Sequence, residues 1–144
     1  MSIYLDTSCL LKMVFPEPES ARVFALCAAE QRVVVSSLSG LEAAVQINAL
    51  FLGGTLTRAG AARIRTKLDA TLALAPYELA IFPPGAVEAA GAQVRLDRRA
   101  IHCRTLDRLH LATMEILGLT RILTNDVAQA RAAEALGYDV LVPR

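Results

Sequence analysis

The sequence lacks the cysteines of a disulfide-linked protein. Cys9, Cys27 and Cys103 are odd in number, and no two of them have CxxC spacing. Disulfide frameworks of secreted domains use an even number of cysteines, and disulfides are rare in reducing compartments. We therefore expect free thiols and a cytoplasmic protein.

The sequence also lacks a targeting segment and a long apolar run. The N-terminus passes from MSIYL directly to Asp6, without the basic region and apolar stretch of a secretory signal. The longest stretch without charge, residues 43–57, contains Gln46, Asn48 and two glycines. A membrane span needs roughly 20 apolar residues, so we expect no association with a membrane.

A large excess of positive charge is absent as well. The net charge is +1 at pH 7, which excludes the global basic field of many nucleic-acid-binding proteins. The positive charge that exists is nearly all arginine, and it forms two groups: Arg58, Arg63, Arg65 and Lys67, and then Arg95, Arg98, Arg99, Arg104 and Arg108. Two interpretations stay open: solvated helix faces, or phosphate contacts around an acidic site.

Apolar residues, by contrast, are abundant. They make up 54% of the chain against 20% charged residues, which excludes intrinsic disorder. A length of 144 residues suits one domain, and we expect it to cover residues 1–144. The apolar content exceeds what one small core needs, which indicates self-association.

Short apolar strands alternate with helices along the chain. We expect strands at residues 3–6, 32–37, 78–83, 120–126 and 138–143. We expect helices from Thr7 to the break at Pro16, then at 19–30, 38–52 (capped by Ser37 or Ser39), 57–74, 85–98, 104–117 and 127–137. This alternation predicts an α/β fold, in which helices cover both faces of a parallel sheet.

The segment RTLDRLHLATMEIL, residues 104–117, contains a carboxylate in an unexpected place. On a helical wheel Arg108 and Glu115 share the side expected to face water, whereas Asp107 lies almost opposite, in an apolar arc beside His110. An ionised carboxylate is costly to bury without a partner. Asp107 is either a first-turn acid that complements the helix dipole, with His110 as a satisfied neighbour, or part of a functional site.

Three further acids occupy positions typical of ligand binding. Asp6 and Asp126 lie at the carboxyl ends of the first and fourth expected strands, where open α/β sheets bind ligands, although each could simply cap the helix that follows. Glu42 shares a narrow polar strip with Ser39 and Gln46 on a helix that is otherwise apolar and is expected to be buried on most sides. That strip either faces solvent or lines a polar site.

Convergence of the four carboxylates would require compensation. Two like charges ~5 Å apart repel by about 3 kcal/mol at an effective dielectric constant of about 20. A small domain should not tolerate several such pairs without a cation or proton uptake. Oxygen ligands without a Cys or His cage favour Mg²⁺ or Mn²⁺ over zinc, and such ions activate water and bind phosphoryl oxygens. The sequence thus predicts metal-dependent hydrolysis of a phosphate ester, without a protein nucleophile.

Two other chemistries fit the residues less well. An aspartyl-phosphate phosphatase usually has a second acid two residues after its strand-end aspartate, and here that position is Ser8. A zinc site made of His102, Cys103 and His110 matches no finger spacing. Both are disfavoured.

The segments YLDTSCLLKMVFPEPES, SSLSGLEAA and RTLDRLHLATMEILGLTRILTNDVAQARAAEALGYDVL resemble PIN-domain ribonucleases of the VapC toxin type. The resemblance spans essentially the whole chain, and it implies a three-layer α/β/α sandwich around a mostly parallel five-stranded sheet with an acidic Mg²⁺ or Mn²⁺ site. Asp6, Glu42, Asp107 and Asp126 match the family's four acids, and Asp6 and Asp107 match its principal metal ligands. Thr124 matches a hydroxyl position that orients a water or ligand.

The resemblance also implies a biological role. Members of this family are endoribonucleases that cleave RNA, form homodimers and act as the toxin of a toxin–antitoxin pair, in which the tail of a cognate antitoxin enters the site. Two alternatives stay open: a PIN-like module that binds RNA or protein without catalysis, and a housekeeping PIN nuclease with no antitoxin.

Overall fold

The computed structural model describes residues 1–96 and 101–144. Within these residues the strands are β1 (Ser2–Leu5), β2 (Arg32–Ser36), β3 (Tyr77–Ala80), β4 (Arg121–Leu123) and β5 (Asp139–Leu141). They form one sheet in the order β3-β2-β1-β4-β5, in which every neighbouring pair is parallel. The prediction of a parallel five-stranded sheet is confirmed.

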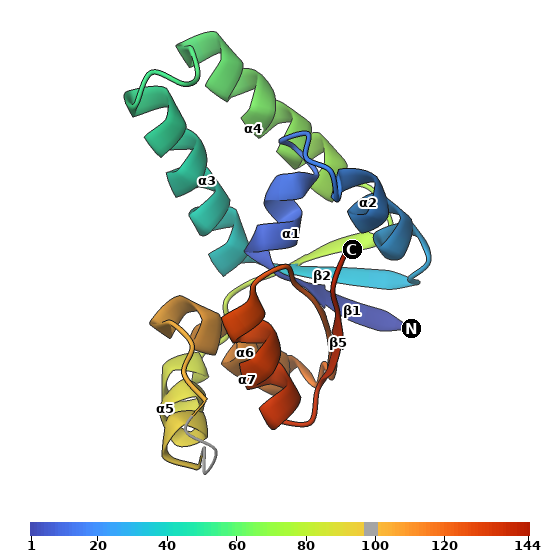
Figure 1. The fold of residues 1–144 in the computed structure, drawn as a ribbon, viewed down its shortest axis with the longest axis vertical. Coiled ribbons are helices and arrows are strands. Elements are labelled where there is room, and N and C mark those ends of the chain that lie inside the picture. Colours follow the sequence, from blue (N-terminus) through green and yellow to red (C-terminus); the bar gives the residue numbers. More distant parts are fainter. Residues whose placement is uncertain (97–100) are drawn as a thin grey trace.

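Helices cover the sheet on both sides, as expected for a three-layer sandwich (Figure 1). One face carries α1 (Thr7–Lys12), α2 (Ser20–Ala28), α3 (Ser37–Leu52) and α4 (Arg58–Leu72). The other face carries α6 (Thr105–Leu117) and α7 (Val127–Ala135), and α5 (Ala86–Leu96) packs against α6.

The alternation of side chains along the strands divides the core in two. Ile3, Leu5 and Val33 point into the cluster under α1 to α4, whereas Tyr4 and Val34 point into the cluster under α6 and α7. All five are fully buried. A strand covered on both faces must be apolar at every position, which explains why the central strands read as continuous apolar runs.

Several boundaries differ from the sequence prediction. The strand expected at 120–126 ends at Leu123, because the chain then turns out of the sheet to begin α7. The cap of α3 is neither Ser37 nor Ser39: Ser36, still extended as the last residue of β2, accepts the N–H of Leu38 at 3.1 Å. The helix expected at 85–98 is α5 as far as Leu96, and Arg98 lies outside the described residues.

Two expectations about burial are wrong. Arg108, placed on the wet side of α6, is 6% exposed, because α5 packs along that side and Arg108 reaches the carbonyl of Ile101 at 3.4 Å. The apolar stripe of α3 is not buried either, since Leu41 and Val45 are each 60% exposed. Only a narrow side of α3 reaches the rest of the fold, so most of its apolar residues stay on the surface.

The state of the three cysteines agrees with the expectation from the sequence. Cys9, Cys27 and Cys103 are buried free thiols. In residues 1–96 and 101–144, the structure contains no helix with the length and apolar content to cross a membrane.

Candidate active site

The four acids singled out in the sequence line one cavity. Asp6 follows β1 and Asp126 lies just beyond β4, at the carboxyl ends of two paired strands. Glu42 comes from α3 on one face of the sheet, and Asp107 comes from α6 on the other. The cavity has a volume of about 240 Å³ and is also lined by Thr7, Ser8, Leu11, Gln46 and Arg104; we call it the acidic cavity.

Asp6 is held through one of its two oxygens. Its Oδ2 caps α1 by accepting the N–H of Ser8 at 3.2 Å, and it also accepts the hydroxyls of Ser8 at 2.6 Å and Thr124 at 3.0 Å. The side chain is 4% exposed, so these donors take the place of water around a buried carboxylate.

Thr124 connects Asp6 to the start of α7. Its hydroxyl is fully buried, accepts the N–H of Asp126 at 3.1 Å, and lies 2.8 Å from the Oε1 of Gln129. Asp126 in turn caps α7, because its Oδ1 accepts the N–H of Gln129 at 2.8 Å. The capping interpretation is therefore correct for both Asp6 and Asp126, and it explains the local backbone.

Glu42 is fixed by a chain of hydrogen bonds that runs into the core. Its Oε1 accepts the hydroxyl of Thr7 at 2.9 Å and lies in close contact with Nε2 of His110. The Nδ1 of His110 is 2.6 Å from the hydroxyl of Tyr4. Burial raises the pKa of Tyr4 and keeps its proton in place, so Tyr4 donates to Nδ1 and His110 donates from Nε2 to Glu42. Although burial acts against it, these donors hold the pKa of Glu42 below its ordinary value.

Asp107 is a buried acid of the cavity, and Arg104 holds one of its oxygens. It is 5% exposed, and its Oδ2 accepts the backbone N–H of Arg104 at 3.3 Å and the Nε of Arg104 at 3.1 Å. Burial raises the pKa of Asp107; Arg104 counteracts this in part, whereas the charges of Asp126 and Asp6 add to it. Asp107 thus favours its protonated form more than an ordinary aspartate does.

Arg104 supplies a cation to the cavity. Besides pairing with Asp107, its guanidinium lies 3.3 Å from Oδ2 of Asp126, so one charge bridges two acids that belong to different helices. The side chain is 75% exposed, which leaves it free to move into solvent. The sequence required either a cation or proton uptake for four acids to share a cavity; the structure provides Arg104 and the raised pKa of Asp107.

Three of the acids share a pattern of used and unused oxygens. All hydrogen bonds that the described residues make to these side chains go to one oxygen: Oδ2 of Asp6, Oε1 of Glu42 and Oδ2 of Asp107. The second oxygen of each receives no hydrogen bond from the residues that the structure describes. Carboxylates oriented by protein donors and left with one unused oxygen are typical of metal-ligand sites, where the surroundings fix the direction of each ligand.

The acids are not yet arranged around a metal position. Across residues 1–96 and 101–144, no group of three or more His, Cys, Asp or Glu side chains is placed so that it could hold a metal ion. The disfavoured zinc set is not brought together, since His110 contacts Glu42 while His102 and Cys103 line a different cavity. In the acidic cavity the guanidinium of Arg104 links Asp107 and Asp126.

Sequence reasoning missed the residues that orient the acids. It treated His110 as a packed neighbour, gave Thr7 no role, and discussed Ser8 only as a missing acid. The pair Thr7 and Ser8 does carry a signal, because hydroxyls directly after a strand-end aspartate are placed to hydrogen-bond within a helix cap. Nothing in the sequence connects Tyr4 with His110, which lies 106 positions later in the chain.

Comparison of the sequence with known proteins identifies the family of this chain. The model of the PIN domain matches residues 3–135, which is most of the chain. The chain belongs to the PIN-domain family. Ribonuclease VapC46 of Mycobacterium tuberculosis, whose name states its activity, is 31% identical to this PIN protein over 144 residues, covering 99% of this chain and 98% of that one.

Solved structures share the PIN fold over their full length. VapBC2 from Rickettsia felis, bound to a DNA fragment from its promoter, has a TM-score of 0.71 at 14% identity, covering 99% of this chain and 98% of that one. VapC20 of Mycobacterium tuberculosis, a toxin that cleaves the sarcin-ricin loop, has a TM-score of 0.68 at 17% identity, covering 94% and 95%. At these identities the likeness establishes the PIN fold.

Proposed function

We propose that this protein is a metal-dependent endoribonuclease that hydrolyses RNA phosphodiester bonds and acts as the toxin of a toxin–antitoxin pair. The observation that carries the proposal is the set of three buried or half-buried carboxylates that line one cavity, each with one oxygen held by the protein and one unused. The likeness to a protein named as a ribonuclease supports RNA as the substrate.

The donor set fits Mg²⁺ or Mn²⁺. The cavity offers carboxylate oxygens and hydroxyls but no thiolate, which is the ligand chemistry of hard divalent cations. Asp6 and Asp107 are the proposed principal ligands, with Glu42 and Asp126 completing the acidic set. Such an ion, when bound, lowers the pKa of a water molecule and polarises a phosphoryl oxygen.

The residues around the acids have separate roles in this proposal. Thr124 and Ser8 hold Asp6 in position, and the hydrogen bond from His110 lowers the pKa of Glu42 against the effect of burial. Arg104 pairs with Oδ2 of Asp107 and Oδ2 of Asp126, and its exposure makes its release from these oxygens inexpensive if a cation replaces its charge. Released from the acids, its guanidinium lies at the mouth of the cavity, where a phosphate of RNA would arrive.

The proposed partners are RNA, a cognate antitoxin and a second copy of the chain, acting together in the cytoplasm. Exposed apolar side chains support such partners, since scattered single residues are ordinary but clusters on one helix indicate contact surfaces. They lie on α3 and on α5: Leu41, Val45 and Leu52, and Val87, Val94 and Leu96.

Substitution of the acids tests catalysis. Asp6→Asn and Asp107→Asn should each abolish RNA cleavage in Mg²⁺ or Mn²⁺, because each removes a charged ligand while an amide oxygen preserves the hydrogen bonds that Oδ2 accepts. Asp69→Asn, at an exposed position of α4, is the control and should cleave like the parent. Cleavage is followed on labelled RNA, and folding is followed by circular dichroism.

The outcome separates the proposal from its alternatives. Persistent cleavage in both Asp6→Asn and Asp107→Asn would show that these acids are not catalytic. RNA binding without cleavage by the parent would indicate a binding module. The parent protein could also cleave RNA in vitro but leave cells that express it growing as well as cells that express Asp6→Asn. That result would indicate a housekeeping nuclease.

A further inference from the structure

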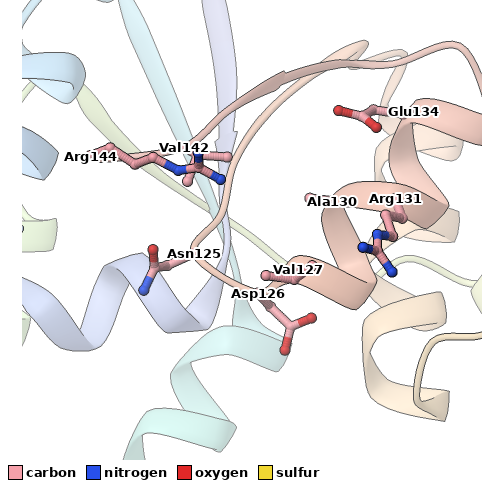
Figure 2. A pocket seen from close by; sticks show the side chains of 8 residues that line it. All are labelled: Asn125, Asp126, Val127, Ala130, Arg131, Glu134, Val142 and Arg144. Carbon is pink, nitrogen blue, oxygen red and sulfur yellow. The ribbon is translucent and has the colours of Figure 1, made fainter.

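A second cavity adjoins the acidic cavity and has a different chemistry. It has a volume of about 250 Å³, and Figure 2 shows Arg144 and Arg131 on opposite sides of it, with Asn125, Val127 and Asp126 near its base. We call it the arginine hollow. Asp126 lines both cavities, so the two lie on either side of this residue.

The two arginines of the arginine hollow, Arg131 and Arg144, are available to bind a ligand. Within the described part of the chain, the side chains of Arg131, Arg144 and Asn125 make no hydrogen bond or ion pair. Glu134 also lines the hollow, but it lies two helical turns from Asp126, and Figure 2 shows it far from Asn125. Two guanidinium groups across a hollow fit a phosphate, because each presents a planar fork of N–H donors.

The rest of the lining suits a nucleoside. Val127 is 61% exposed, and together with Ala130 and Val142 it offers an apolar surface beside the amide of Asn125. A base needs both kinds of contact, an apolar surface for its ring and an amide for its edge. Ligand pockets for larger molecules span roughly 300–1,000 Å³, so this hollow is of a size for one nucleoside unit.

The position of Asp126 relates the two cavities to one substrate. Its Oδ2 faces Arg104 in the acidic cavity, while its neighbours Asn125 and Val127 line the arginine hollow. We propose that the arginine hollow binds the nucleotide next to the scissile phosphate, with Arg131 and Arg144 on its phosphate and Asn125 on its base. This inference rests on the proposed ribonuclease function, because it assumes that the scissile phosphate lies at the acids.

RNA binding by charge-matched variants tests the subsite. All proteins carry Asp6→Asn to prevent cleavage, and the probe is a fluorescein-labelled, mixed-sequence single-stranded RNA in Mg²⁺, followed by fluorescence anisotropy. Arg131→Gln and Arg144→Gln should each raise Kd about fivefold or more and reduce the slope of log Kd against log salt by about 0.7. Arg22→Gln is the control: it removes the same charge from an exposed position of α2, on the opposite face of the sheet.

A series of RNA lengths then locates the effect. With a dinucleotide that has no terminal phosphate, whose single phosphate lies at the acids, Arg131→Gln and Arg22→Gln should bind equally. The difference should appear when the RNA carries the next phosphate, which Arg131 and Arg144 are proposed to bind. A general electrostatic effect would change binding of every length alike and would overturn the proposal.

The remaining outcomes distinguish the subsite from the function on which it rests. If the parent cleaves RNA and Arg131→Gln binds no worse than Arg22→Gln, the subsite is refuted and the nuclease function stands. A labelled acidic peptide serves as a second probe. If Arg131→Gln binds this peptide more weakly than Arg22→Gln does but binds RNA equally well, the hollow belongs to a protein partner and the proposal is overturned. If the parent neither binds nor cleaves RNA, both proposals fall together.

Discussion

Replacing Thr124 with valine removes one hydroxyl from the centre of the acidic cavity and should lower the thermal stability of the protein. The hydroxyl is fully buried and lies within 3.0 Å of Oδ2 of Asp6 and 2.8 Å of Oε1 of Gln129. It has one proton, so it can donate to only one of these oxygens. If it donates to Asp6, Gln129 must turn its amide and donate Nε2, which otherwise has no partner among the described residues.

The magnitude follows from the bonds that valine cannot make. A hydrogen bond to a charged group contributes about 1.5–3 kcal/mol, and leaving the N–H of Asp126 without its acceptor costs about 1–3 kcal/mol. Contributions within one network do not add, so we expect a total of about 2–4 kcal/mol. Valine has the shape of threonine and creates no cavity. In a chain of 144 residues this corresponds to a fall in Tm of roughly 6–12 °C.

The assay is thermal unfolding followed by circular dichroism at neutral pH in EDTA, so that metal binding does not contribute. Thr124→Ser is the matched control, because it keeps the hydroxyl and loses only a methyl group, which costs about 1 kcal/mol. A Thr124→Val protein that melts within about 2 °C of the parent would refute the reasoning. So would a Thr124→Ser protein that falls as far as Thr124→Val.

Two further predictions concern ionisation in the cavity. Because burial raises the pKa of Asp107, the folded state holds that proton more tightly than the unfolded state, and its contribution to stability is lost as the pH rises through the folded pKa. In EDTA near pH 8, the Tm of Asp107→Asn should therefore be no lower than that of the parent. Any excess of its Tm over that of the parent should shrink toward pH 4. A Tm several degrees below that of the parent at pH 8 would favour a purely structural role for Asp107. In His110→Leu, Glu42 loses its Nε2 donor while its burial remains. An NMR titration should therefore find the pKa of Glu42 raised relative to the parent, and an unchanged pKa would show that His110 does not lower it.

The alternation of apolar strands and helices was sufficient to predict the layers of the fold. Its limits appear where one element packs on another. A helical wheel places Arg108 beside Glu115, and Glu115 is indeed exposed, but α5 covers Arg108. The wheel describes one helix, and the position of α5 depends on contacts such as that between Gln93 and Glu115, which no local pattern contains.

The order of strands and helices was also sufficient to predict that the acids lie close together. It was not sufficient to predict which residues hold them in place. Parallel strands end at one edge of a sheet, so Asp6 and Asp126 had to be neighbours once β1 and β4 were paired. The link from Tyr4 through His110 to Glu42 joins three elements from different parts of the chain. Such contacts depend on side-chain directions in the folded core, which the spacing of residues does not specify.

The strand order has a consequence for how the protein is made. In chain order β1 precedes the other four strands of this sheet, yet it lies at the centre of the sheet, and its outer neighbours on one side are β2 and β3, which come next in the chain. The core beneath α1 to α4 can therefore begin to form early, apart from the contribution of Leu123. The hydrogen bond from Thr124 to Asp6 joins residues 118 positions apart. When Thr124 has been added to the nascent chain, three of the four acids are present and only Asp126 is still missing. The acidic cavity is complete only when β4 joins the sheet, so any activity it has begins only after the chain has been synthesised beyond Asp126.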